Sequence, residues 1–590
     1  MFNSKIRNTQ MKINIIGKTL VATSLLSAAL VVGCKDTFLE VAPNGQLTNA
    51  LLTSKAGLEG SLMGAYSMLN GRGFSRLASS SNWVYGSILG GDANKGTESG
   101  DYGAINPIQR FETIASAGDV EDTWKAKYEG ISRANAVIRL VATADASVSA
   151  ADKARILAEA KFLRGHYYFE LKRLFNYAPY VDESVDYGTG IEKIKNDSDL
   201  WPKIEADFKA AMDALPATQI SAGRANKWAA AAYLAKTYMY QKKYTDAKAL
   251  YDQIIANGTT ASGKKYGLVA KYAEVFNAAN DNNEESVFAI QAAANTGSTN
   301  NANPENDLNF PYGGASAPGG CCGFFQPSFE LVNSFRTDAN GLPLLDGSYN
   351  STANAVKNDY GLASKDAFTP DAGNLDPRLD HSVGRRGVPY LDYGDFPGAD
   401  WIRSQAYAGP YSPKKFIYYK SQEGTLTDGS SWTRGYAAMN YNIIRYADVL
   451  LMAAEAEVEV GSLAKATEYV NLVRNRAANK AGWVTTASGA PAAKYVIAPY
   501  STFASKAAAT AAVRFERKLE LSGEGHRFFD LVRWGVAATE INNYLTYEGG
   551  ILKVALGGAK FTAGKSEYLP IPATQIDRQG KDILKQNPGY

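Results

Sequence analysis

The chain has 590 residues, 45% hydrophobic and 21% charged, which is typical of a globular protein with a large core. Its 62 Lys and Arg nearly balance 59 Asp and Glu, and the resulting charge of +3 argues against nucleic acid as a partner. The three histidines, His166, His381 and His526, are far apart in sequence, which argues against an HExxH or multi-histidine metal centre.

The N-terminus has the features of a signal peptide. Basic residues precede an apolar run at residues 19–33, which is too short to cross a bilayer as a helix. The run ends in Leu30-Val31-Val32-Gly33-Cys34, which resembles the lipobox of bacterial lipoproteins. We therefore expect a lipoprotein signal peptide at 1–33, lipidation at Cys34, and an anchored body at 34–590. An ordinary signal peptide with an incidental cysteine is the alternative, and translation starts at Met1 or Met11.

Helical patterns dominate the first half of the body. An amphipathic stretch covers residues 54–69, and regular helix resumes near Glu121. Ser149 and Asp152 form a capping box that opens a long helix, which ends before Pro179. A further helix runs from about Asp199 to Pro216. The pattern predicts a stack of helices.

Two later segments, residues 226–258 and 446–477, share the spacing of tetratricopeptide-like helical hairpins. Ala235 precedes Ala247 by twelve residues, and Ala454 precedes Ala466 by the same interval. Small residues at these positions allow paired helices to pack closely. In the second hairpin, Gly461 is expected to form a left-handed cap and Ser462 to cap the following helix. We predict a helical platform at about 50–280 and 441–540; two unrelated surface hairpins are the alternative.

The pattern changes between about residues 281 and 440. Helical periodicity largely disappears, and Gly, Asn, Asp, Pro and aromatic residues become frequent. A connection of this length inside a compact protein usually carries function or strands of its own. We predict a loop-rich binding region formed by about 75–120 and 281–440, supported by the helical platform.

Sequence motifs of catalysis are mostly absent. The chain contains no GxxxxGK[ST] loop, no GxSxG elbow and no CxxC. We expect no catalytic residue, no metal and no cofactor. A carboxylate pair for glycoside hydrolysis stays open, because such pairs are defined by distance in space and not in sequence.

Cys321 and Cys322 are adjacent, in a glycine-rich segment that continues into Phe324 and Phe325. Adjacent Cα atoms lie about 3.8 Å apart across a trans peptide, which is shorter than the ~4.4–6.8 Å usual for a disulfide. The flanking glycines could accommodate the distorted turn that a vicinal disulfide requires. Both a disulfide, which would stiffen a loop presenting the two phenylalanines, and a pair of free thiols remain open.

The abundance of aromatic residues suggests sugar binding, because the C–H face of a pyranose packs against an aromatic ring. For any single ring, however, core packing is the commoner role. We assign Trp124, Trp201, Trp228 and Trp534, which follow helical patterns, to the core. Trp83, Trp401 and Trp432 lie in loop-like sequence and remain candidates for ligand contact.

Near the C-terminus the sequence resembles the SusD/RagB family of outer-membrane nutrient-binding lipoproteins. The closing motifs are Phe515-Glu516-Arg517-Lys518-Leu519-Glu520-Leu521, Gly523-Glu524-Gly525-His526-Arg527 and Asp530-Leu531-Val532-Arg533-Trp534-Gly535. Further similar stretches are Ala158-Glu159-Ala160-Lys161-Phe162-Leu163-Arg164, residues 445–477, Asp376-Pro377-Arg378-Leu379, Tyr568-Leu569-Pro570-Ile571-Pro572 and Gln586-Asn587-Pro588-Gly589-Tyr590. The resemblance covers essentially the whole body of the chain.

This resemblance implies a mainly α, SusD-like fold, with a tetratricopeptide-like helical platform and an irregular ligand-binding half containing some short β-strands. It also implies a non-catalytic protein, lipid-anchored at the surface of the outer membrane of a Bacteroidetes-type bacterium. Such a protein captures an oligosaccharide or polysaccharide and delivers it to a SusC-like, TonB-dependent outer-membrane transporter.

The resemblance places the ligand contacts in the loop after the first helix and in the loop before Pro327-Ser328-Phe329-Glu330-Leu331. The residues at those places are Trp83, Tyr85, Asp92, Asn94, Phe310, Tyr312, Phe324 and Phe325. Trp401 is added on composition alone. The charged residues Glu516, Arg517, Glu520, Arg527, Asp530 and Arg533 are interpreted as an intrachain ion-pair network, since buried charges must be paired.

Three other functions remain open. A surface glycoside hydrolase would release reducing ends from a polysaccharide. A related capture protein would bind peptides or glycoproteins. A helical-repeat scaffold would bind protein partners alone.

Overall fold

The computed structural model describes residues 48–71 and 73–590, so the predicted signal peptide and Cys34 lie outside the described residues. The helices range in length from 4 to 26 residues. The helices are α3 (Asn49–Leu52), α4 (Lys55–Tyr66), α5 (Ile105–Gln109), α6 (Gly118–Ala142), α7 (Ala150–Phe175), α8 (Trp201–Ala214), α9 (Lys227–Tyr240), α10 (Tyr244–Asn257), α11 (Phe329–Ser334), α12 (Leu379–Ser382), α13 (Gln405–Ala408), α14 (Tyr446–Val460), α15 (Leu463–Ala477), α16 (Lys506–Glu520), α17 (Arg527–Arg533), α18 (Ala537–Ile551), α19 (Lys553–Leu556) and α20 (Ala573–Gln579).

The strands are short and pair in antiparallel twos. They are β1 (Ala93–Gly96), β2 (Ser286–Ile290), β3 (Phe324–Pro327), β4 (Val383–Gly384), β5 (Ser412–Pro413), β6 (Thr427–Asp428), β7 (Tyr436–Ala437) and β8 (Tyr441–Arg445). The pairs are β1–β3, β2–β8, β4–β5 and β6–β7. Three of these pairs join strands that are distant in sequence, so they connect separate parts of the chain.

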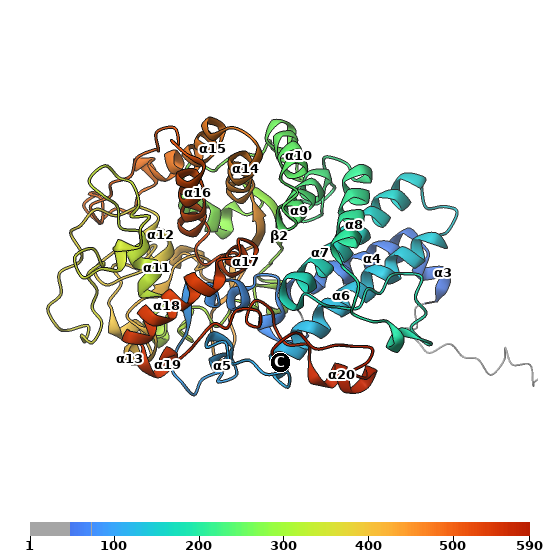
Figure 1. Cartoon of the computed structure of the whole chain (residues 1–590), viewed down its shortest axis with the longest axis horizontal. Coiled ribbons are helices and arrows are strands. Elements are labelled where there is room, and N and C mark those ends of the chain that lie inside the picture. Colours follow the sequence, from blue (N-terminus) through green and yellow to red (C-terminus); the bar gives the residue numbers. More distant parts are fainter. Residues whose placement is uncertain (1–47, 72) are drawn as a thin grey trace, which may run out of the picture.

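The long helices form one continuous series. Each of α6 to α10 packs against its neighbour in sequence, α10 packs against α14, and α14 packs against both α15 and α16 (Figure 1). Ala235, Ala247, Ala454 and Ala466, the small residues of the repeated spacing, are fully buried. The two predicted hairpins therefore belong to a single helical platform.

Local capping explains where several helices begin. The Ser149 hydroxyl accepts a hydrogen bond from the Asp152 backbone N–H, and the Ser462 hydroxyl accepts one from that of Lys465. The expected left-handed cap at Gly461 is wrong, because its φ is −124°. A side chain at Gly461 would instead collide with the carboxylate of Glu457, which accepts a hydrogen bond from the Ser462 backbone N–H.

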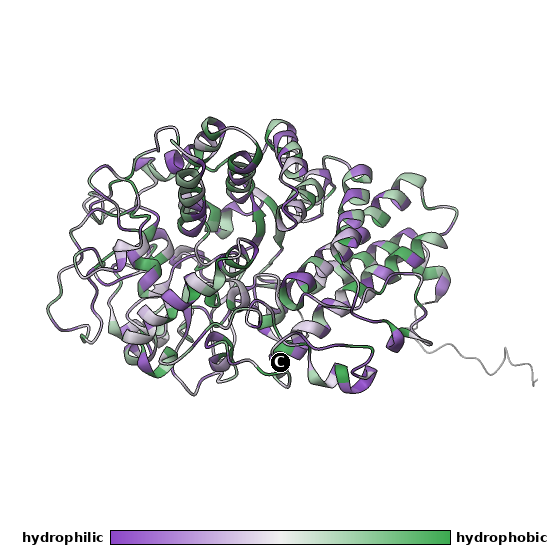
Figure 2. Cartoon of the chain, viewed as in Figure 1, coloured by the Kyte–Doolittle hydropathy of each residue, from purple (hydrophilic) through white to green (hydrophobic). Residues whose placement is uncertain are grey.

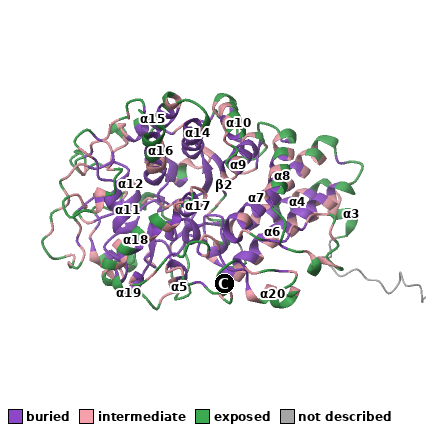
Figure 3. Cartoon of the chain, viewed as in Figure 1, coloured by how far each residue is buried: buried purple, intermediate pink, exposed green. Residues whose placement is uncertain are grey.

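The loop-rich half lies beside this platform and contains β3 to β7 with the short helices α11 to α13 (Figure 1). Hydrophobic and hydrophilic residues alternate along the long helices (Figure 2), and the buried positions extend from the helices into the loop-rich half (Figure 3). The two halves thus share one core, and much of the irregular region is interior.

Candidate functional site

Eight of the nine predicted ligand contacts are buried. They are Trp83, Tyr85, Asp92, Asn94, Phe310, Phe324, Phe325 and Trp401, each no more than 7% exposed. Tyr312, at 39%, is the one that faces solvent. A ring enclosed by protein offers no face for a sugar to pack against, so the expectation that these eight line an open surface is corrected.

Most of these residues come together, but as an interior layer. Trp83 begins a short π-helix, Trp83–Ile88, and its ring meets Phe325 edge-on at 5.9 Å between centroids. Asn94 pairs with Gln326 in the β1–β3 ladder, which also holds Phe324. Asp92 accepts a hydrogen bond of 2.9 Å from the backbone N–H of Gly523. The loop after the first helix and the loop before α11 therefore lie against each other, with these side chains facing inward.

Trp401 and Phe310 are buried in the loop-rich half. The Trp401 indole lies edge-on to Tyr390 at 5.6 Å and to Phe396 at 5.5 Å. Phe310 packs against Tyr418 at 5.5 Å. The high aromatic content of this region therefore supplies a core for a segment with few helices.

Cys321 and Cys322 form a vicinal disulfide. The flanking glycines Gly320 and Gly323 have positive φ angles, which side chains rarely adopt. Because Phe324 and Phe325 are buried, the loop does not present them to a ligand as the disulfide hypothesis supposed.

An exposed aromatic ring lies on the β6–β7 hairpin. Trp432 is 42% exposed, and the Arg76 guanidinium lies 5.7 Å from the centre of its ring. Tyr436 meets the same ring edge-on at 6.0 Å. We define the Trp432 surface as Arg76, Asp307, Trp432 and Tyr436.

A bidentate ion pair fixes Arg76 within this surface. Its Nε and Nη2 donate to the two carboxylate oxygens of Asp307 at 2.6 and 2.8 Å, and the Tyr436 hydroxyl interacts with the same guanidinium. The hydrogen bond to Asp307 raises the pKa of Arg76, whereas burial raises the pKa of Asp307 against the opposing effect of Arg76. The arrangement holds a charged donor beside an exposed indole.

A buried carboxyl group lies close to Asp307 in the chain. Glu305 is 2% exposed, and its Oε2 has no hydrogen-bond partner among the described residues. Burial, with a contribution from Asp307, raises the pKa of Glu305 to about 8. The segment that carries Asp307 is therefore polar but poorly solvated.

Tyr312, on the loop that precedes β3, provides a second exposed ring. The Arg403 guanidinium lies 5.3 Å from its centroid and pairs with Glu98 and Asp101. The Thr433 hydroxyl, next to Trp432, donates to the backbone carbonyl of Gly319, so the hairpin contacts the loop that carries Tyr312. Tyr312 is thus the one predicted contact that retains the geometry required for a ligand.

The sequence analysis did not predict Arg76, Asp307 or Tyr436 as site residues. It named Trp432 as a candidate for ligand contact but did not include it among the nine predicted contacts. One signal could have selected Trp432: it follows Gly429, Ser430 and Ser431, a polar turn sequence with no apolar neighbour to bury the indole. No local signal marks Asp307, because its partner Arg76 is distant in the chain.

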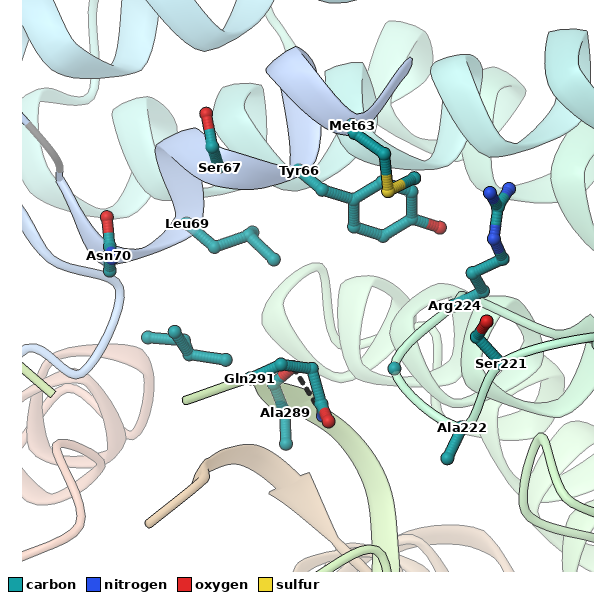
Figure 4. Close-up of a pocket in the computed structure, with 12 residues that line it drawn as sticks. Met63, Tyr66, Ser67, Leu69, Asn70, Ser221, Ala222, Arg224, Ala289 and Gln291 are labelled. Atoms are coloured by element: carbon teal, nitrogen blue, oxygen red, sulfur yellow. Dashed lines mark hydrogen bonds between the residues drawn. The ribbon is translucent and has the colours of Figure 1, made fainter. Parts of the chain in front are cut away.

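A cavity of about 500 Å³ lies between α4, β2 and residues 221–224 (Figure 4). Two of its polar side chains, Tyr66 and Arg224, already have carboxylate partners within the chain. The Tyr66 hydroxyl donates to Glu159 at 2.7 Å, and Arg224 donates to Glu59 at 2.6 Å. We therefore do not assign the ligand site to this cavity.

Metal centres and membrane-spanning helices are both absent from the part of the chain that the structure describes. No group of three or more His, Cys, Asp or Glu side chains there could hold a metal ion. Within residues 48–71 and 73–590, no helix is both long enough and apolar enough to span a bilayer.

A helical-repeat platform joined to a loop-rich half with exposed aromatic rings defines the class of protein. The profile of the SusD family matches residues 284–590, and a second profile, described as starch-binding associating with outer membrane, matches residues 37–239. The chain therefore belongs to the SusD family, which confirms the resemblance seen in its motifs.

Curated relatives and solved structures agree with this assignment. The chain is 28% identical over 455 residues to SusD-like protein P25 of Formosa agariphila, covering 73% of this chain and 75% of that protein. It is 25% identical over 457 residues to the starch-binding protein SusD of Bacteroides thetaiotaomicron, covering 75% and 74%.

Among solved structures, a SusD superfamily protein from Bacteroides vulgatus matches with a TM-score of 0.67 and 21% identity, covering 91% of this chain and 99% of that one. Surface glycan-binding protein A from Bacteroides thetaiotaomicron, in complex with laminarihexaose, matches with a TM-score of 0.63 and 20% identity, covering 90% and 99%. These similarities confirm the predicted mainly α, SusD-like fold.

Proposed function

We propose that this protein is a non-catalytic, cell-surface glycan-binding lipoprotein, and that the Trp432 surface contacts the sugar. The observation that carries the proposal is the exposed indole held beside a fixed guanidinium. The indole offers a flat apolar face to sugar C–H groups, and the Arg76 guanidinium offers N–H donors to a hydroxyl. Tyr312 is proposed as a further contact.

The expected affinity is modest. Covering about 100 Å² of one ring at about 25 cal/mol/Å² gives roughly 2.5 kcal/mol before the cost of association. That cost is several kcal/mol, so two or three such contacts correspond to millimolar to micromolar binding. This range suits a protein that captures a ligand and then releases it.

The ligands of similar proteins support the proposal. One similar structure holds laminarihexaose, another is described as laminarin-binding, and one curated relative is a starch-binding protein. The description of the second family profile supports association with the outer membrane. Lipidation at Cys34, exposure at the cell surface and delivery to a SusC-like, TonB-dependent transporter are proposed from the family resemblance.

The proposal is tested by replacing Trp432 with Ala and measuring glycan binding by calorimetry and affinity gels across plant, fungal and host glycans. We expect the best ligand to bind the W432A variant at least tenfold more weakly, because the stacking face is lost. The Tyr177→Ala variant removes a similarly exposed ring, 41% exposed and outside this surface, and should bind normally.

Other results would favour the other functions. Unchanged affinity in the W432A variant would remove Trp432 from the site. Release of reducing ends would support the glycoside hydrolase, and absence of binding to every glycan would leave the peptide-binding or protein-scaffold functions.

A further inference from the structure

A second cleft, of about 680 Å³, lies where α16, α17 and α18 meet the turn around Asp346 and Tyr349 (Figure 1). It shares no lining residue with the Trp432 surface. Its volume falls within the roughly 300–1,000 Å³ typical of small-molecule sites. Three cationic side chains, those of Arg514, Lys518 and Arg527, line it.

Arg527 is unusual among the arginines of this region. Its side chain is 12% exposed and forms an ion pair of 3.7 Å with Glu540, and it also interacts electrostatically with the buried carboxyl groups of Glu330 and Asp92. It donates no hydrogen bond to any of them. By contrast, Arg517 donates to Asp530 and Asp448. Ion pairs thus form between Asp530 and both Arg517 and Arg533, as the sequence predicted, whereas Arg527 lines the cleft and pairs with Glu540.

A guanidinium this buried normally has a carboxylate partner, because removing an unpaired charge from water is costly. Arg533, on the same helix, illustrates the rule: it donates to both oxygens of Glu455 at 2.6 and 2.7 Å. Arg527 has five N–H groups and the planar geometry that binds two oxygens of one anion. Arg527 has an ion-pair partner in Glu540 but donates no hydrogen bond to a carboxylate of the described chain.

Arg514 adds a second open cation. Its guanidinium lies 4.8 Å from the centre of the Trp534 ring, no described carboxylate pairs with it, and its Nε has no hydrogen-bond partner. Lys518 is not available in the same way, since its Nζ binds Glu330 at 2.5 Å. The cleft therefore offers two guanidinium groups that donate no hydrogen bond to a carboxylate of the described chain.

The acidic groups that line the cleft do not satisfy them. Glu330 is bound to Lys518, and Asp346 accepts hydrogen bonds from the backbone N–H and hydroxyl of Ser348. The Glu540 side chain is 49% exposed and reaches Arg527 no closer than 3.7 Å. A ligand anion could therefore approach Arg527 more closely than the chain's own carboxylate does.

We infer that this cleft binds an acidic sugar unit through its carboxylate or sulfate group, with Arg527 as the main contact and Arg514 as the second. The requirement for an anion comes from the cleft alone, whereas its identification as a saccharide rests on the proposed function. The cleft is much larger than a free ion needs, and the partly buried rings of Phe515 and Trp534 line it for the sugar. A uronate and a sulfated sugar share the paired oxygens that a guanidinium binds.

The test is calorimetry with trigalacturonate, a sulfated galactose trisaccharide and neutral laminarihexaose, at low and high salt. We expect at least one acidic trisaccharide to bind the unmodified protein and to bind more weakly at high salt. The Glu540→Gln variant removes the competing carboxylate and should bind it three- to tenfold more tightly. The Arg527→Gln variant should bind it at least tenfold more weakly, and Arg527→Lys should retain part of the affinity.

The two proposals fail separately. The W432A variant should bind the acidic trisaccharide within twofold of the unmodified protein, and Arg527→Gln should leave laminarihexaose binding unchanged. Failure of both acidic trisaccharides to bind, or equal affinity of the Glu540→Gln variant and the unmodified protein, would overturn the inference without affecting the Trp432 surface. If Arg527→Gln does not fold, Glu540→Gln decides the question, since that side chain is half exposed.

Discussion

Glu305 is a single buried residue whose protonation should change the stability of the whole protein. Its pKa is raised to about 8 by burial, from an ordinary value near 4.5 in the unfolded chain. The folded state therefore binds more protons between these values, so the stabilising contribution of Glu305 is fully present below about pH 4.5 and is lost as the pH rises through 8. Each unit of pKa difference corresponds to about 1.4 kcal/mol.

The Glu305→Gln variant should lack this contribution. Other buried carboxyls with raised pKa values, such as Asp281 and Glu548, also titrate in this range, so the difference between variant and unmodified protein is the useful quantity. We expect similar melting temperatures at pH 5 and a higher melting temperature for the variant at pH 8.5. The same substitution at exposed Glu192 serves as the control. An equal difference at both pH values would contradict the prediction.

At the same scale, Trp83 and Trp432 show what the sequence cannot decide. Both lie in loop-like sequence, and residue type alone makes both candidates for ligand contact. Trp83 is buried because Phe325, far along the chain, packs against it, whereas Trp432 lies on a polar turn. Burial of a loop residue depends on such long-range partners, which explains why eight predicted contacts proved to be interior.

Helical elements were more predictable because their signals are local. The twelve-residue interval between buried alanines and the hydroxyl cap at Ser149 each depend on residues within one hairpin or one turn. The short π-helix Trp83–Ile88 was not predicted, because it exists where the chain packs closely against the turn at Gly525. Its position depends on this tertiary contact, so the local sequence does not predict it.

This contact makes Gly86 the most sensitive position of that element. A Cβ at Gly86 would lie 2.0 Å from the carbonyl oxygen of Gly525, which is far inside van der Waals contact. We expect Gly86→Ala to lower the free energy of unfolding by several kcal/mol, because the backbone at Gly86 or at Gly525 must move to make room for the methyl group. The matched control is Gly64→Ala in α4, where nothing lies within 4 Å and helix propensity should contribute up to about 1 kcal/mol of stability. Denaturant unfolding of both variants distinguishes a steric clash at Gly86 from the general effect of replacing glycine with alanine. Equal free energies of unfolding for the two variants would refute the predicted clash.

The whole molecule is connected by a buried network of arginines and carboxylates. Burial alone would raise the pKa of Glu520, yet Arg476, Arg445 and Arg378 hold it at about 2. The sequence indicated the acidic members of this network, because Glu516 and Glu520 lie one helical turn apart. It could not show that their partners come from residue 378, from β8 and from α15, three segments distant in sequence.

Arg445 is the member whose loss should affect the molecule most. It is fully buried, and it donates to Glu285, Glu520 and Glu524 at 2.6 to 2.9 Å, which joins β8 to β2 and to the segment that follows α16. The Arg445→Met variant preserves much of the side-chain volume but leaves these carboxylates with fewer partners, which should cost about 3–5 kcal/mol. The control is Lys465→Met, whose partner Glu468 is exposed, with an expected cost below about 1 kcal/mol. Urea unfolding provides the comparison: a cost for Arg445→Met no larger than that of the control would mean that packing, and not this network, holds the loop-rich half against the helical platform.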